Sequence, residues 1–165
     1  MTILRDISII WSLLHTLILF TLLFESRYPK KKTLILTLST MLPLIFLNFL
    51  LVLLFGPESY GMLLLLTISL PSLIFFWLLA KHRDGRFFFT FCLVDTSVLE
   101  VIYITQIINY YITPDSYLFM FVARLLIFPF IEWLFYKRLR PVYLSIQRYS
   151  QKGWGTFAVI SAFFT

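Results

Sequence analysis

Four ionisable side chains lie within two long apolar segments in the second half of the sequence. Asp95 and Glu100 belong to residues 87–112, and Arg124 and Glu132 belong to residues 117–136. A charged side chain at the centre of a bilayer costs about 3 kcal/mol on insertion scales, so it normally faces a partner or a water-filled cavity. These residues are therefore the first candidates for a binding or gating site.

Glu100 and Arg124 have matching depths if both segments are helices. At about 1.5 Å per residue, each lies roughly 18–20 Å from the end of its segment that borders a basic connection. The short connection 113–116 makes the two segments neighbours. We therefore predict a Glu100–Arg124 ion pair, which would serve either to fix helix packing or to act as a gating element with two states.

The remaining polar residues of these segments extend the candidate site. At about 100° per residue, Asp95, Gln106 and Asn109 share one helix face, and we include all three as ligand or gating candidates. No partner is assigned to Asp95. Glu132 is close to the end of its segment, where we expect it to reach the basic connection.

No catalytic residue, metal site or cofactor site is predicted. Cys92 is the one cysteine, which excludes a disulfide or a thiolate metal site within one chain. His15 and His82 lie in different segments and in no ligand cluster. The sequence has neither a glycine-rich phosphate loop nor a metalloprotease motif. Enzyme activity is therefore not expected from these residues.

Composition defines the elements that must position these side chains. Apolar residues make up 60% of the 165 residues and charged residues 13%, whereas soluble domains have about 25% charged residues. Each apolar segment is long enough, at roughly 20 residues, to cross a membrane as a helix. We predict an all-α polytopic bundle with five full spans and a started sixth, at about 7–24, 33–55, 62–80, 87–112 and 117–136, then 155–165.

The sixth segment supports a further expectation. Eleven residues cover only about half of a ~30 Å hydrocarbon core, so we expect the sequence to be the front part of a longer protein. The preceding residues 139–151 have apolar side chains at helical spacing opposite arginine and glutamine. This pattern predicts an amphipathic helix in the membrane interface, with an ordinary basic loop as the alternative.

The cations predict the orientation. Lysine and arginine collect in the connections after the first, third and fifth segments, and none occurs in 56–61 or 113–116. The positive-inside rule then makes the basic connections cytoplasmic and places the N-terminus outside the cell membrane. The net charge of +6 is explained by these loops beside anionic lipid, so no nucleic-acid partner is expected.

Several local features resemble one family. They are residues 24–33 (FESRYPKKKT), a glycine-containing turn after the second segment, Arg140 with Pro141, and residues 152–154 (KGW) before a further apolar stretch. Together they resemble the membrane sensor region of GHKL-type sensor histidine kinases, which are related to bacterial peptide-pheromone receptors.

The resemblance implies the sensor region of a two-component kinase that forms a homodimer and responds to an extracellular peptide or small molecule. Kinase activity would reside only in a C-terminal part, because neither His15 nor His82 matches the family's phospho-accepting histidine. Two alternatives remain, a small-solute transport subunit and a non-catalytic membrane interaction protein. Transport sites draw polar groups from several helices, and the candidates here concentrate on two, which favours sensing.

Overall fold

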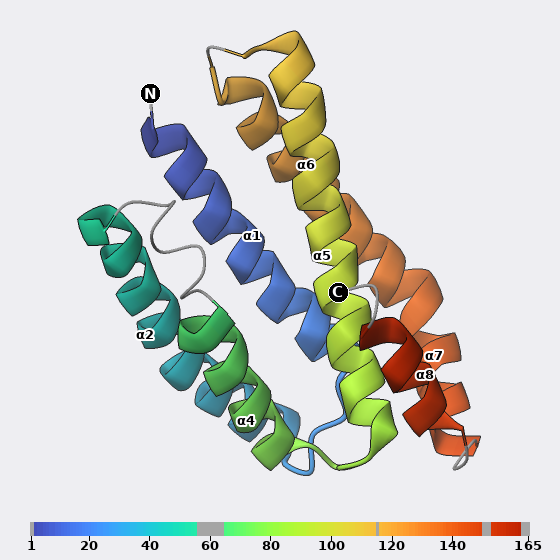
Figure 1. Cartoon of the computed structure of the whole chain (residues 1–165). Coiled ribbons are helices and arrows are strands. Elements are labelled where there is room, and N and C mark those ends of the chain that lie inside the picture. The colour runs from blue at the N-terminus through green and yellow to red at the C-terminus, as the bar shows by residue number, and fades with distance from the viewer. Residues whose placement is uncertain (1, 56–64, 115, 150–152, 163–165) are drawn as a thin grey trace. The chain divides into compact units, whose positions relative to one another are not determined.

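The computed structural model describes residues 2–55, 65–114, 116–149 and 153–162, and these residues form helices nearly throughout (Figure 1). The predicted all-α class is confirmed for this part of the chain. Two short segments, η1 and η2, are π-helical. The elements in order are α1 (Thr2–Leu23), α2 (Lys30–Phe55), η1 (Leu65–Ser69), α4 (Leu70–Leu79), α5 (Gly85–Ile112), α6 (Leu118–Leu134), η2 (Phe135–Leu139), α7 (Arg140–Tyr149) and α8 (Trp154–Ala162).

Four helices are long and apolar enough to cross a membrane. They are Leu4–Leu23, Lys30–Phe55, Gly85–Ile112 and Leu118–Tyr149. The predicted third span, 62–80, contains the shorter apolar helix Leu66–Leu79, while residues 62–64 lie outside the described residues. Its α-helical part begins only at Leu70, with Pro71 in the first turn, where the missing N–H of proline costs nothing. A fifth span is therefore not confirmed.

The helix from Leu118 continues much further than the predicted segment 117–136. α6, η2 and α7 form one uninterrupted helical stretch, Leu118–Tyr149, which we call the long helix. A π-turn inserts one extra residue without ending the helix, which is why the basic residues Lys137 and Arg138 do not form a loop. A helix is thus present within residues 139–151, whereas its position at a membrane interface remains a prediction.

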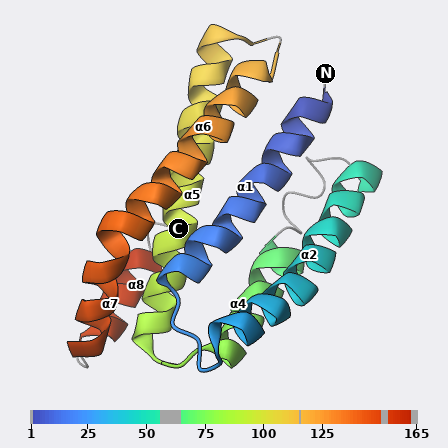
Figure 2. The same cartoon turned by 180° about the vertical axis from the view of Figure 1, so that it is seen from behind.

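The chain divides into two units, which are described separately. The first unit contains α1, α5, the long helix and α8. α1, α5 and α6 pack against one another, and α1 and α6 run in the same direction (Figures 1 and 2). Leu19, Val94 and Phe128, one from each of these helices, are almost fully buried between them. The core of this unit therefore lies along the line where the three helices meet.

α8 packs against α5 near the beginning of both helices. A Cβ atom on Gly85 would lie 2.5 Å from the backbone nitrogen of Gly155 and 2.6 Å from the carbonyl carbon of Trp154. Only glycine permits this backbone approach. Trp154 is buried there, and its ring lies 5.5 Å from that of Phe89.

The second unit comprises residues 25–83, with α2, η1 and α4. Asn48 in α2 is buried, and its side-chain oxygen accepts a hydrogen bond from Thr67 Oγ1 at 2.7 Å. At the other end, Arg27 N donates to the Leu79 carbonyl oxygen at 3.0 Å, next to an isolated bridge between Ser26 and Ala80. These contacts hold the start of α2 beside the end of α4.

Candidate functional site

Arg124 is the central polar residue of the first unit. Its side chain is 2% exposed although it has a charged group. The guanidinium donates three hydrogen bonds, to Ser8 Oγ at 2.9 Å, to Thr105 Oγ1 at 2.9 Å and to the carbonyl oxygen of Ile102 at 3.2 Å. α1, α5 and α6 therefore meet at one arginine, whose rigid fork of donors suits three acceptors in different directions.

The predicted Glu100–Arg124 ion pair is wrong. Both residues are described, and no ion pair joins them; Glu100 is exposed on α5, whereas Arg124 is buried. The prediction matched the depths of Glu100 and Arg124 along their helices, but it did not match the directions in which the two side chains point. Thr105, five residues after Glu100, lies on the buried face, and a shift of five residues turns a helix by about 140°.

A second buried contact joins α1 to the long helix through two ionisable residues. His15 Nδ1 forms a hydrogen bond and ion-pair contact with Glu132 Oε1. The histidine ring also stacks on Phe128 at 5.0 Å and meets the Trp11 ring edge at 4.4 Å. His15 therefore belongs to a polar contact after all, and Glu132 reaches α1 rather than the basic connection.

A third contact lies at the end of α1. Arg140 Nε donates to the carbonyl oxygen of Leu22 at 2.8 Å. Carbonyl groups in the last turn of a helix have no partner within the helix, and a cation there also interacts favourably with the helix dipole. Arg140 thus caps α1 from the long helix.

These three contacts form a regular series, which we call the polar ladder. On α1 the contact positions are Ser8, His15 and Leu22, each separated by about two helical turns. The sequence separation of the contacting residues increases from 116 to 117 to 118 along the series. The long helix therefore supplies one residue more per interval than α1, and each of its intervals contains an irregularity, Pro129 or the π-turn η2.

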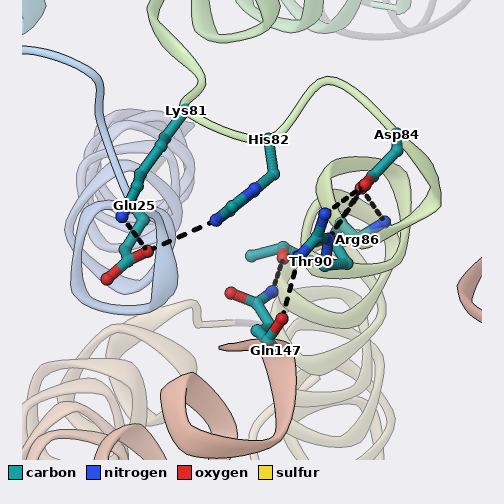
Figure 3. Close-up of polar contacts among 7 residues, drawn as sticks. All are labelled: Glu25, Lys81, His82, Asp84, Arg86, Thr90 and Gln147. Carbon is teal, nitrogen blue, oxygen red and sulfur yellow. Dashed lines mark hydrogen bonds and ion pairs between the residues drawn. The ribbon is translucent and has the colours of Figure 1, made fainter. Parts of the chain in front are cut away.

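The end of the long helix is fastened to α5 by another polar cluster. Tyr143 and Gln147 are buried, and Thr90 Oγ1 lies 2.8 Å from Tyr143 Oη and accepts from Gln147 Nε2 at 3.0 Å. Arg86, which is paired with Asp84 at 2.6 Å, donates to the Gln147 carbonyl oxygen at 2.9 Å (Figure 3). Gln147, which the sequence placed on the polar face of this helix, is thus part of a packed contact.

The second unit has its own polar cluster at the end of α4. The Glu25 carboxylate accepts from Lys81 Nζ at 3.3 Å and lies 3.6 Å from His82 Nε2 (Figure 3). The three residues are partly or fully exposed. Solvent therefore screens the Glu25–Lys81 ion pair, which should contribute well under about 1 kcal/mol to stability.

The other predicted candidates occupy separate positions on α5. Asn109 is buried and forms the turn after α5, where its amide donates to the Ser116 carbonyl oxygen at 3.0 Å and its oxygen accepts from Met120 N at 3.0 Å. Asp95 is half-buried and Gln106 is exposed. Within the described chain, no hydrogen bond or ion pair joins any of Asp95, Glu100 or Gln106 to Arg124.

Three residues that were not predicted, Ser8, His15 and Thr105, complete the contacts of Arg124 and Glu132. The available signal was the seven-residue spacing from Ser8 to His15, which places both on one face of α1. The described residues contain no group of three potential metal ligands. The site offers hydrogen bonding and a titratable histidine–carboxylate pair between helices, and no nucleophile with a base.

Comparison of the chain with protein-family models, with curated proteins and with solved structures finds no match.

Proposed function

We propose that this chain is the membrane-embedded input region of a two-component sensor histidine kinase, with kinase activity in a part that follows it. The polar ladder is the observation that supports this proposal best. It links α1 to the long helix by Ser8–Arg124, His15–Glu132 and Leu22–Arg140. The long helix then continues to Tyr149, so one continuous helical stretch connects the buried polar contacts with the basic end of the unit.

Such a ladder suits the transmission of a displacement. In a low-dielectric surrounding an unpaired polar group is expensive, so the three contacts resist small, independent shifts. Helices held in this way change position in discrete steps, typically by a small shift or by one turn, rather than by continuous sliding. A ligand that displaces α1 or α6 would therefore act on α7. Tyr143 and Gln147 would pass this displacement to α5, because both contact Thr90.

Membrane placement belongs to the same proposal. Four helices are long enough to cross, and Leu66–Leu79 together with the residues before it would form a fifth span. Apart from Arg5 and Arg124, the described cations of the first unit lie at the start of α5 and in the long helix from Lys137 onward, and two of them, Arg86 and Arg140, contact the ends of the long helix and α1. By the positive-inside rule this end is cytoplasmic and the start of α1 is outside the cell.

The test uses the natural full-length protein. Autophosphorylation is measured with and without stimulus for Arg140→Gln, which removes one contact of the ladder, and for Arg138→Gln, an exposed neighbour on the same helix. We expect Arg140→Gln to change the ratio of stimulated to basal activity and Arg138→Gln to leave it unchanged. A gene whose reading frame stops directly after Thr165, or a full-length protein without ATP-dependent phosphorylation, would contradict the proposal.

A small-solute transport subunit is the second candidate, and one observation favours it. α1 contributes Ser8 and His15 to the polar groups of α5 and α6, so polar side chains converge from three helices rather than two. Convergence of this kind is typical of transport sites. Solute uptake by proteoliposomes that contain the purified chain, and its loss in Arg124→Leu, would favour transport over sensing.

A further inference from the structure

The half of α5 after Glu100 presents an exposed face with a regular spacing. Glu100, Tyr103, Ile107 and Tyr110 are exposed and follow one another at steps of three, four and three residues, and we call them the α5 seam. Tyr103, Ile107 and Tyr110 are 60%, 57% and 70% exposed. Steps of four and three are the spacing with which two helices interdigitate side by side.

Glu100 makes this face unsuitable for lipid. The residue is exposed, and among the described residues none lies within hydrogen-bond or ion-pair distance of its carboxylate. Ionisable side chains on membrane helices almost always face a partner, a cavity or another helix. The described part of α8 does not provide this partner: its ring contacts to α5 lie at Phe89, about 16 Å along the helix before Glu100, and no ion pair joins it to Glu100.

We propose that the α5 seam packs against the α5 seam of a second copy of this chain. Two copies of one membrane protein insert in the same direction, so their α5 helices are parallel and equal residues lie at equal depth. A two-fold axis between them places the acceptor Glu100 of each copy near the phenol donor of Tyr103 in the other. The seam thus contains both partners of each hydrogen bond and is complementary to itself.

Hydrogen bonds between side chains contribute to the association of membrane helices. Lipid tails compete with apolar side chains for packing but offer no hydrogen bonds, so a carboxyl and a phenol gain by meeting across an interface. The apolar Ile107 would fill the space between the level of Glu100 and Tyr103 and the level of Tyr110. The inference rests on the α5 seam alone and holds whether the chain acts in sensing or in transport.

A cysteine scan along α5 tests the arrangement in native membranes. In a Cys92→Ala background, single cysteines at 100–112 are oxidised with copper phenanthroline, and the linked dimer is quantified. We expect maxima at Glu100, Tyr103, Ile107 and Tyr110, and minima at Val101 and Thr105, which are buried in the unit. A profile without this period, or a protein that stays monomeric by single-molecule photobleaching, would overturn the proposal.

A matched pair of variants tests the chemistry. Glu100→Leu should raise the dissociation constant of the dimer about tenfold, because two symmetric hydrogen bonds are lost and each contributes roughly threefold in membranes. Tyr111→Leu alters a residue that is 79% exposed but lies beside the seam, and it should leave the constant unchanged. Equal effects of both substitutions would exclude the second copy as the occupant.

Discussion

His15 Nδ1 is hydrogen-bonded to the carboxylate of Glu132, a residue that follows it by 117 positions. The imidazole is 5% and the carboxylate 17% exposed, so water contributes little to solvating either group. Stacking on Phe128 fixes the plane of the ring and hence the direction of its nitrogen. The contact lies in the middle of the polar ladder and is the one step in which both partners are ionisable.

Removing one member of this pair should destabilise the protein. His15→Leu and Glu132→Leu should each lower the free energy of unfolding by about 1–3 kcal/mol, because the remaining group is left buried without its partner. The double substitution should recover much of this loss, since no unpaired polar group remains. Thermal unfolding of the purified chain in detergent measures the cycle. Strictly additive losses would show that the two side chains do not interact.

Arg124 should not be replaceable by lysine. A lysine keeps the charge but concentrates its donors on one atom, and it cannot reach Ser8, Thr105 and the Ile102 carbonyl oxygen together. We expect Arg124→Lys to lower the free energy of unfolding by about 1–3 kcal/mol. Arg138→Lys, at an exposed site, is the control and should stay within about 0.5 kcal/mol. An equal stability of both variants would argue against the three-helix contact.

The helical class was predictable because it depends on runs of apolar residues. Length and hydropathy located the helices to within a few residues, as for Gly85–Ile112 against the predicted 87–112. The long helix was not predictable in the same way, because charged residues such as Lys137 normally end an apolar run. The continuity of this helix depends on the π-turn and on the tertiary contacts of Tyr143, and a hydropathy profile predicts neither.

The polar contacts were only partly predictable, for a geometric reason. Depth along a helix follows from counting residues, so Arg124 was correctly selected as a residue that needs partners. Direction around the helix and the choice of neighbour follow from packing, and they led to Thr105 and Ser8 instead of Glu100. Serine and threonine are also common in these apolar segments, so the sequence does not distinguish Ser8 and Thr105 from the other hydroxyl residues.

Topology provides a test that does not depend on packing. In a Cys92→Ala background, cysteine at Thr113 should react with a membrane-impermeant thiol reagent in intact cells, because the turn after α5 lacks cations and should lie outside. Cysteines at Ser26 and Tyr149, next to the basic residues, should react only after the cells are opened. The reverse pattern would invert the proposed orientation.

The contact between α5 and α8 should depend on one of its two glycines. Gly85→Ala places a Cβ atom 2.5 Å from the backbone of Gly155, and neither backbone can yield without moving a helix. We expect a loss of about 1–3 kcal/mol in the free energy of unfolding and a separation of α8 from α5.

Gly155→Ala is the matched control, since its Cβ atom meets nothing within 4 Å. It should leave stability unchanged or raise it by up to about 1 kcal/mol through better helix propensity. Docking of α8 is measured by cross-linking cysteines placed at Phe89 and Phe157, whose ring centroids are 6.2 Å apart, with a short bifunctional thiol reagent, and with Cys92 replaced by alanine. The cross-link should form in the Gly155→Ala protein and be reduced in the Gly85→Ala protein. Equal cross-linking in both variants would show that α8 does not approach α5 through Gly85.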